Sequence, residues 1–296
     1  MKILVLGCHG QLGRCLHDQL ETSDLDVVYA SREEIDISDF EQTRIKVTKI
    51  APNFVINATA YTAVDRAETD LKTAERINHL AVENIADICL KLTCWLVHIS
   101  TDYVFDGTSK VPYKEEDQTN PQGVYGNTKL KGEKAIQVSG CQYIILRTAW
   151  VFSEYGTNFL KTMLRLGSER DSVDIVGDQI GCPTYAQDVA RAIVTIIPTL
   201  NKGDSLSGLY HFCGDSPCSW YHFAKDIFSE ADKLNLRTPK SVRSITTSDY
   251  ETVAVRPSYS AFNCSKFEDR FNIKMLSRRR AIKISLKSLV KSGFFG

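Results

Sequence analysis

Short apolar segments alternate with amphipathic helical segments through the first half of the chain. The apolar segments show little polar alternation, which is typical of strands covered on both faces, as in a parallel sheet. They cover Lys2–Leu6, Asp26–Ala30, Asn53–Asn57, Trp95–Ile99 and Tyr143–Leu146. Between two of them, the apolar residues of 71–91 recur at the three- and four-residue steps of a helix. This alternation predicts an α/β fold with a Rossmann-like, doubly wound parallel sheet.

The second half of the chain lacks this alternation. After about residue 150, helices and short strands are separated by turns with glycine and proline, at 181–183, 214–217 and 256–257. A chain of 296 residues can form one large core and a smaller appended lobe. We therefore expect a Rossmann domain over 1–150, with 173–200 returning to it. A smaller C-terminal α/β substrate lobe would contain 151–172 and 201–296.

A glycine-rich turn joins the first predicted strand to a helical segment. Glycines at this spacing allow a tight turn, let a pyrophosphate approach the backbone, and let the helix pack on the strand. The helix N-terminus adds amide donors and partial positive charge. An ordinary glycine-rich turn is the alternative, but the position directly after the first strand favours dinucleotide binding. The predicted contact residues are Gly7, Gly10, Gln11, Leu12 and Gly13.

The residues after the second predicted strand favour NADP(H) over NAD(H). NAD-preferring sites usually place a carboxylate there, whereas the hydroxyl of Ser31 and the cation of Arg32 can accommodate a 2′-phosphate. Glu33 and Glu34 follow at once, so a solvated surface role for Arg32, and use of NAD(H), remain alternatives. Other cofactor-binding candidates in the loops after strands are Asp36, Ile37, Ala60, Tyr61 and Thr62.

A hydroxyl, a phenol and an amine form the candidate catalytic group. Thr101 follows the fourth predicted strand, and Tyr125 and Lys129 are four residues apart on one helix face. A phenol with a pKa near 10 needs a nearby cation to work as an acid-base group at neutral pH. We therefore expect Tyr125 to donate a proton to a carbonyl oxygen that Thr101 positions, and Lys129 to support Tyr125 and contact the cofactor ribose.

Together these motifs resemble the extended short-chain dehydrogenase/reductase superfamily. The resemblance is closer to one member, the dTDP-4-dehydrorhamnose reductase family, over nearly the whole chain. The segments that carry it are 10–13, 62–68, 100–107, 124–133, 146–152, 158–159, 178–184 and 256–260.

The resemblance implies NADPH-dependent reduction of dTDP-4-dehydro-6-deoxy-L-mannose to dTDP-L-rhamnose by the three catalytic candidates. It also implies that Asp102 and Trp150 contact the sugar, and Arg256 could pair with the substrate diphosphate. A core aromatic and a surface charge are the alternative roles of Trp150 and Arg256. Two other functions stay open: reduction of another nucleotide-linked 4-keto-6-deoxysugar, and a non-catalytic NADP-binding regulatory subunit, as in one relative of this family.

Composition excludes several other classes of function. Lys and Arg total 36, as do Asp and Glu, so we expect no nucleic-acid or membrane partner. Nine cysteines, an odd number, predict reduced thiols in the cytoplasm. The pairs 89/94 and 213/218 lack histidines at zinc-ligand spacing and are interpreted as buried apolar residues. The opening 1–8 has only four consecutive apolar residues, too few for a signal peptide, and is expected to be a strand.

A metal site is not expected. Some members of the resembled family form dimers around a magnesium ion held by carboxylates of both subunits, and at two of those positions this chain has Cys15 and Gln187. A thiol and an amide are poor magnesium ligands. Asp18 and Asp188 lie nearby, but helical geometry directs each to a different face from the matching position. We therefore predict no bridging magnesium, and we leave a homodimer open.

Overall fold

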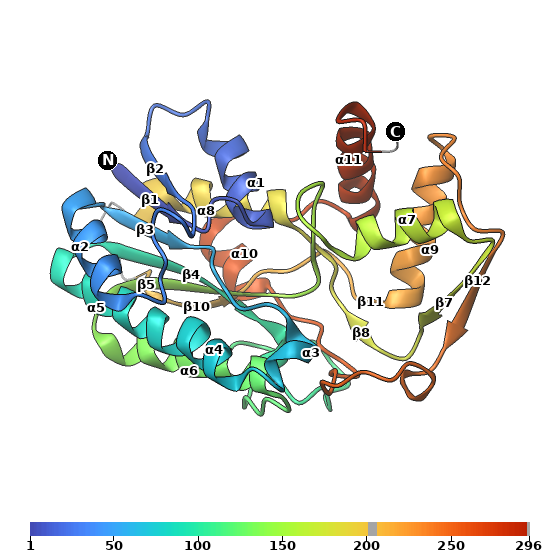
Figure 1. The fold of residues 1–296 in the computed structure, drawn as a ribbon, viewed down its shortest axis with the longest axis horizontal. Coiled ribbons are helices and arrows are strands. Elements are labelled where there is room, and N and C mark those ends of the chain that lie inside the picture. Colours follow the sequence, from blue (N-terminus) through green and yellow to red (C-terminus); the bar gives the residue numbers. More distant parts are fainter. Residues whose placement is uncertain (201–205, 295–296) are drawn as a thin grey trace.

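A computed structural model describes residues 1–200 and 206–294, and its largest element is a parallel sheet of six strands (Figure 1). The strand order is β10-β5-β4-β3-β1-β2. The strands are β1 (Lys2–Leu6), β2 (Asp26–Ala30), β3 (Phe54–Asn57), β4 (Trp95–Thr101), β5 (Gln142–Thr148) and β10 (Gly208–His211). The chain order reverses between β1 and β3, where ligands bind in folds of this kind. The predicted doubly wound α/β fold is confirmed.

Helices cover both faces of the sheet (Figure 1). On one face lie α1 (Gln11–Leu20), α8 (Ala186–Leu200) and α10 (Ser265–Phe271). On the other lie α2 (Phe40–Ile50), α5 (Ala81–Leu92) and α6 (Val124–Ser139). Successive strand residues therefore enter different cores: Val5 packs with α8, and Leu4 packs with α5. This two-sided burial explains why the strands read as continuous apolar segments.

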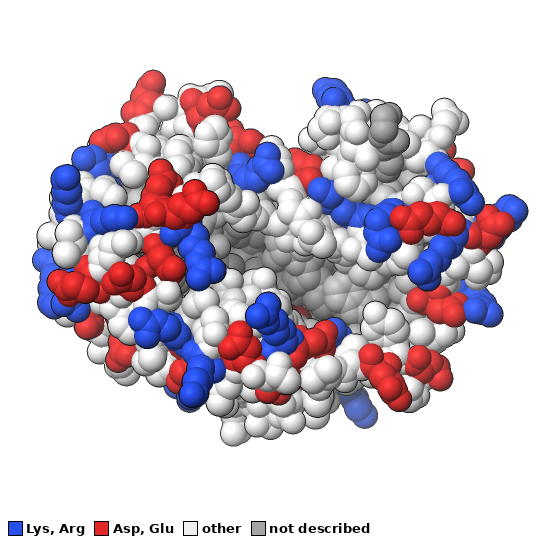
Figure 2. Space-filling view, viewed as in Figure 1, with Lys and Arg blue, Asp and Glu red and all other residues white. Residues whose placement is uncertain are grey.

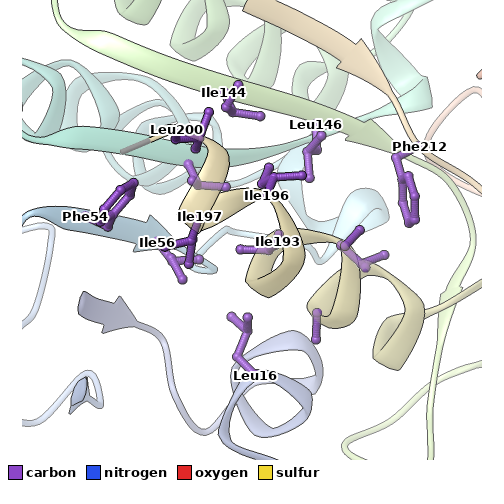
Figure 3. Packing of buried hydrophobic residues seen from close by; sticks show 14 of the residues in the cluster. Leu16, Phe54, Ile56, Ile144, Leu146, Ile193, Ile196, Ile197, Leu200 and Phe212 are labelled. Atoms are coloured by element: carbon purple, nitrogen blue, oxygen red, sulfur yellow. The ribbon is translucent and has the colours of Figure 1, made fainter. Parts of the chain in front are cut away.

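The helix α8 packs on the main sheet. Its Ile193, Ile196, Ile197 and Leu200 pack among Phe54 and Ile56 of β3 and Ile144 and Leu146 of β5, with Leu16 of α1 nearby (Figure 3). Two strands differ from the expectation. β7 (Ser172–Val176) does not join the main sheet and pairs with β12 (Ser241–Ile245). β10, expected in the smaller lobe, pairs with β5, because its Leu209 and Tyr210 fit the cores on opposite faces of the sheet.

The second half of the molecule has a core of its own. It is formed mainly by α7 (Phe159–Glu169), α9 (Trp220–Asp232) and α11 (Arg278–Lys291), on the right of Figure 1. Short strand pairs support it: β7 with β12, β8 with β11, and β6 with β9. Their bounds are β6 (Val151–Phe152), β8 (Ile180–Gly181), β9 (Thr184–Tyr185) and β11 (Cys218–Ser219), and a 3₁₀ turn, η3, covers Thr247–Asp249.

The helical segment predicted over 71–91 contains an irregular turn. It begins as α4 (Leu71–Glu75), continues as a π-helical turn, η1 (Arg76–Leu80), and ends as α5. Asn78 lies in this turn, and its side chain bonds the backbone of Tyr61 and the hydroxyl of Thr128. Such turns are frequent at functional sites. Two short elements near them are α3 (Val64–Ala67) and the 3₁₀ turn η2 (Asp102–Val104).

Two further predictions bear on the whole chain. The cysteines at 89, 94, 213 and 218 are buried free thiols, as interpreted from the sequence. In the part of the chain that the structure describes, none of the helices has the length and apolar character needed to span a membrane.

Candidate functional site

The carboxyl ends of the parallel strands meet at one edge of the sheet. This edge faces the half of the molecule that contains α7, α9 and α11 (Figure 1). Figure 2 shows a hollow at the boundary, with an uncharged floor and lysines, arginines and carboxylates on its rim. Gly7 follows β1, Thr101 ends β4, and Trp150 lies two residues after β5. The topology therefore brings the main predicted site residues to one crevice.

The glycine turn has the close packing that a pyrophosphate site needs. Gly7 adopts a left-handed conformation, with φ of 81°, and its amide donates to the carbonyl of Ala30. A Cβ on Gly13 would lie 2.2 Å from the carbonyl oxygen of Gly7, so α1 can approach the strand only with glycine there. Gly10 is the N-cap of α1 and has no side chain to bond the first-turn amides. These features fit a dinucleotide phosphate.

Gln11 and Leu12 follow Gly10 at the start of α1, and their side chains have different contacts. The side-chain oxygen of Gln11 accepts hydrogen bonds from Ser153 (2.9 Å) and Asn158 (2.8 Å), both after β5. Leu12 packs against the core beneath the sheet face. The side chain of Gln11 therefore ties the glycine turn to the segment that leads into α7, a role that sequence spacing did not indicate.

The predicted 2′-phosphate residues lie after β2. Arg32 is 79% exposed, and its Nε donates to Asp36 at 3.3 Å. The amide of Ser31 donates to the carboxylate of Glu34 at 2.7 Å, so that acid is engaged with the backbone. Ile37 is buried in the core under α2. Arg32 is therefore exposed enough to turn toward an anion, and it must leave Asp36 to do so.

The loop after β3 is held by the π-helical turn. Asn78 accepts from the amide of Tyr61 at 2.9 Å and donates to its carbonyl at 3.1 Å, and the Tyr61 hydroxyl donates to Asp70. Ala60 and Thr62 flank this anchored residue and are partly or fully exposed. Asn78 was missed by sequence reasoning, although a polar residue at an apolar helix position was a signal for it.

Tyr125 and Thr101 are brought together by a close helix contact. A Cβ on Gly126 would lie 2.1 Å from the carbonyl oxygen of Tyr103, so only glycine lets α6 approach η2 this closely. The rings of Tyr103 and Tyr125 meet edge to face, with centroids 5.4 Å apart. Burial raises the pKa of Tyr125 to about 12, although a hydrogen bond with the Thr101 side chain acts in the opposite direction. Tyr125 is therefore protonated and can donate.

Lys129 lies one turn after Tyr125 on α6 and is buried. Its Nζ donates to the carbonyl oxygen of Ile99 at 2.6 Å and lies 3.2 Å from Nε2 of His98. Burial lowers the pKa of Lys129 to about 8, and the nearby carboxylate of Glu133 limits the shift. A lysine near this pKa can hold or release a proton at neutral pH. Sequence reasoning missed His98, which occupies an apolar strand position.

Asp102 presents an open acceptor next to the catalytic candidates. Its Oδ1 accepts from the Thr101 hydroxyl at 3.1 Å. Its Oδ2 is one of four buried side-chain polar atoms that lack a hydrogen-bond partner among the described residues. Burial raises the pKa of Asp102 to about 6, and hydrogen bonds from Ser260 and Thr101 oppose the shift. An unpaired buried acceptor of this kind suits a sugar hydroxyl.

Trp150 is held in a strained conformation at the junction of the two halves. Its φ is 48°, which is unusual for a bulky residue. One face of its ring stacks on Trp220, with centroids 3.4 Å apart and planes 5° apart. A Cβ on Gly181 would lie 2.3 Å from the ring. Trp220, which sequence reasoning missed, therefore determines how Trp150 is presented to the crevice.

Arg256 is engaged by another side chain of the protein. Its guanidinium donates to the carboxylate of Asp65 at 2.8 Å, and Asp65 also accepts from the amide of Ala254. Glu68, one turn further along the chain, accepts from the amide of Val124 at the start of α6. The segment 62–68 therefore holds both the start of α6 and the segment 254–256, which the motif alone did not reveal.

The positions compared above with magnesium ligands of the resembled family offer few suitable groups. Cys15 is buried. Asp18 accepts from Tyr155 at 2.8 Å and from Gln187, so it does face the second position, unlike our expectation for its helix face. Asp188 turns toward Arg191. Across residues 1–200 and 206–294, no three His, Cys, Asp or Glu side chains are grouped to hold a metal ion.

The chain matches a family model and is similar to curated proteins over nearly its whole length. The family model described as the RmlD substrate binding domain matches residues 1–291. The chain is 40% identical over 285 residues to a dTDP-4-dehydrorhamnose reductase of Aggregatibacter actinomycetemcomitans, covering 95% of this chain and 97% of that protein.

Two solved structures are also similar. A dTDP-4-dehydrorhamnose reductase of Clostridium acetobutylicum superposes with a TM-score of 0.91 at 35% identity, covering 98% of this chain and 99% of that one. The Bacillus anthracis protein of the same name, solved in complex with NADP, has a TM-score of 0.90 at 34% identity, covering 97% and 99%.

Proposed function

The chain belongs to the RmlD substrate binding domain family, and from this membership we propose that it reduces the 4-keto group of dTDP-4-dehydro-L-rhamnose to dTDP-L-rhamnose with NADPH. Relatives that carry the name of this reductase match nearly the whole chain. The family and the activity predicted from the motifs are thereby confirmed. The observation that carries the function within the molecule is the hydrogen bond of Tyr125 with Thr101, with the buried Lys129 one helical turn further along α6.

The residues present fit the cofactor. Gly7, Gly10 and Gly13 would hold its pyrophosphate at the N-terminus of α1, and Ser31 and Arg32 would receive the 2′-phosphate. When bound, NADPH supplies the hydride for the keto carbon.

The protein's own part in the reaction is proton transfer and positioning. Tyr125 is protonated in the crevice and donates its hydroxyl proton to the keto oxygen as that oxygen gains charge. Thr101, within hydrogen-bond reach of Tyr125, holds the oxygen in line. Lys129, one turn further along α6, stabilises the phenolate that remains and, with a pKa of about 8, can supply a proton. Thr101, Asp102 and Lys129 are buried, so bulk water is excluded from their contacts.

We assign the substrate contacts as proposals. Asp102 accepts a sugar hydroxyl through its unpaired oxygen. Trp150 packs against the sugar with the part of its ring that Trp220 leaves exposed. Arg256 reaches the diphosphate after it leaves Asp65, which makes this contact the weakest of the three. We further propose that 1–150 with α8, β10 and α10 form the cofactor domain, and that the remaining elements after 150 form the substrate lobe.

An assay across nucleotide sugars tests the proposal. NADPH oxidation is measured with dTDP-, GDP-, UDP- and CDP-linked 4-keto-6-deoxysugars, and the product is identified by NMR. We expect turnover with the dTDP sugar and formation of the rhamnose product. Turnover with another nucleotide alone would change the substrate. Binding of NADPH without oxidation with any of the four would instead identify a regulatory subunit.

Replacing Arg32 with aspartate should reverse the cofactor preference. The change removes a cation from the 2′-phosphate and adds a carboxylate that can hold ribose hydroxyls, so NADPH affinity should fall by about 1–3 kcal/mol while NADH affinity is kept or improved. Both dissociation constants can be measured by nucleotide titration. Arg44→Asp, on the surface of α2, is the matched control and should change neither constant. Equal losses for NADPH and NADH in Arg32→Asp would contradict the assignment.

Removal of divalent metal should not affect activity. Cys15 and Gln187 lack the hard anionic oxygen that magnesium requires, so we expect the same kcat and the same elution volume with EDTA and with added magnesium. A dimer that dissociates in EDTA would show that Asp18 does serve as a ligand. The homodimer itself and the cytoplasmic location remain predictions, and sedimentation and cell fractionation can test them.

A further inference from the structure

A buried chain of hydrogen-bonding groups leads from the loop after β3 to the catalytic lysine. The amide and hydroxyl of Thr59 donate to Oδ1 of Asn57 at 3.1 and 2.5 Å. Nδ2 of Asn57 lies 3.2 Å from Nδ1 of His98. Nε2 of His98 lies 3.2 Å from Nζ of Lys129. Asn57 and His98 are fully buried, and Lys129 is nearly so, so solvent does not compete for these contacts.

The direction of the hydrogen bonds is determined at the Thr59 end. A backbone amide can only donate, so the oxygen of the Asn57 side chain must face Thr59 and its NH₂ group must face His98. The opposite amide orientation would place two donors against each other. Because the Asn57 NH₂ donates, Nδ1 of His98 must accept, and the single ring proton is on Nε2. A charged imidazolium is excluded in the same way.

The environment of His98 agrees with this assignment. Burial holds the pKa of His98 well below its usual value, and the adjacent Lys129 lowers it further. The ring is therefore neutral, and its Nε2–H points at Nζ of Lys129. An ammonium has three N–H donors and no acceptor, whereas a neutral amine has a lone pair. The contact between His98 and Lys129 is a hydrogen bond only when Lys129 is uncharged.

None of the other described groups around Lys129 donates a hydrogen bond that favours its neutral amine. The carbonyl of Ile99, from β4, accepts from Lys129 in either protonation state. Glu133, one turn along α6, favours the charged form, but its two oxygens are engaged by Arg147 of β5 at 2.9 and 2.7 Å.

Two more titratable groups lie on the substrate side. Tyr125 is one turn before Lys129 on α6 and is protonated. Asp102, of η2, acts mainly on Tyr125 and Tyr103. His98 is therefore the one described side chain in contact with Nζ that favours the amine by a directed hydrogen bond.

We propose that His98 is a positioning residue that, held as its Nε2–H tautomer by Asn57, stabilises the neutral amine of Lys129 and so enables Lys129 to return a proton to Tyr125 after each reduction. This inference rests on the proposed reductase function. The Tyr125 O–H bond breaks as the substrate oxygen is protonated. One N–H bond of the Lys129 ammonium then breaks, the Tyr125 O–H bond re-forms, and the amine lone pair accepts from His98. A proton from water restores the ammonium before the next cycle.

Two substitutions test the proposal through the pH dependence of kcat/KM. In Asn57→Asp, one carboxylate oxygen still accepts from Thr59 and the other accepts from Nδ1–H of His98, so Nε2 turns its lone pair to Lys129 and favours the ammonium. In His98→Phe the Nε2–H donor is absent. Both changes should raise the pKa of Lys129 and move the alkaline decline of kcat/KM to higher pH by about one unit or more. An unchanged decline in both variants, or a shift to lower pH, would overturn the proposal.

Asn84→Asp is the matched control for Asn57→Asp. Asn84 of α5 is also buried, but its side-chain NH₂ donates to the carbonyl of Phe40 on α2 and not to a neighbour of Lys129. It should leave the alkaline decline in place. If His98→Phe fails to fold, the nearly isosteric Asn57→Asp carries the test alone, because it preserves the shape of the chain while it reverses the hydrogen-bond polarity and adds one negative charge.

A second measurement does not depend on turnover. The pKa of Lys129 is read from the Cε chemical shift of the full-length protein labelled at lysine Cε, with Lys129→Arg identifying its signal. We expect a higher midpoint in Asn57→Asp than in the unsubstituted protein. A midpoint that does not move would reject the role of His98 even if the protein is an active reductase. A shifted midpoint in a protein that oxidises no NADPH would support that role and reject the proposed function instead.

Discussion

Replacing Tyr125 with phenylalanine is expected to lower kcat for the keto sugar by about 10²–10⁴-fold while leaving NADPH affinity nearly unchanged. The substitution keeps the ring that meets Tyr103 edge to face and removes only the proton that the keto oxygen receives. Turnover is followed by NADPH oxidation and cofactor affinity by titration of the free enzyme. A large loss of kcat with an unchanged dissociation constant assigns the effect to chemistry and not to folding.

A second tyrosine provides the control. Tyr210 of β10 is buried, and its hydroxyl donates to the carbonyl of Leu206 at 2.9 Å, away from the crevice. Tyr210→Phe removes a buried hydroxyl of the same kind and should change kcat by no more than about twofold, because a typical hydrogen bond contributes about 1 kcal/mol to stability and this one does not touch the site. Near-native kcat in Tyr125→Phe would show that another group donates the proton.

The largest effect on stability is expected from the buried ion pair beside the catalytic helix. Glu133 of α6 and Arg147 of β5 form two hydrogen bonds of 2.9 and 2.7 Å, and both side chains are almost fully buried. In Glu133→Gln the guanidinium keeps its charge and faces an amide NH₂. Breaking a buried pair from one side typically costs about 3–5 kcal/mol, so the free energy of unfolding should fall by about this amount. Denaturant titration measures it.

Removing both charges should restore part of the loss. In Glu133→Leu combined with Arg147→Met no unpaired charge is buried, and the double variant should be more stable than either single one. The exposed pair of Arg165 and Glu169 on α7 is the control, and Glu169→Gln should leave the free energy of unfolding almost unchanged. If Glu133→Gln lowered the free energy of unfolding as little as this control, another group would have to compensate the guanidinium charge. His211, whose Nε2 already lies 3.4 Å from the guanidinium, is the candidate.

Much of the fold could be predicted because its signals are local. The first five sheet strands were located within one or two residues of their observed bounds, since each is a short apolar segment between turns. The glycine turn was recognised because the spacing and the preceding strand are adjacent in the chain. Tyr125 and Lys129 could be paired because a helix brings residues four apart onto one face. In each case the deciding interaction spans only a few residues.

Errors and omissions occurred where the deciding contact is distant in the sequence. β7 and β10 are both short, and only their partners β12 and β5 determine that one lies outside the main sheet and the other within it. The irregular turn at Asn78 depends on Tyr61 and Thr128, and the position of Trp150 depends on Trp220. Periodicity carries no information about such partners, because it describes which face a residue occupies and not what that face meets.

The sequence by itself therefore determined the class of fold and predicted the cofactor turn and the proton donor, because strand and helix periods and the spacing of a motif are properties of the local chain. The tertiary structure decided which polar groups share a site. His98 reads as a polar interruption in an apolar strand until folding brings Asn57 to one ring nitrogen and Lys129 to the other. The tautomer of His98 depends on donors and acceptors from three separate elements, and the protonation state that Lys129 favours depends on that tautomer. No local sequence pattern shows that these groups come into contact.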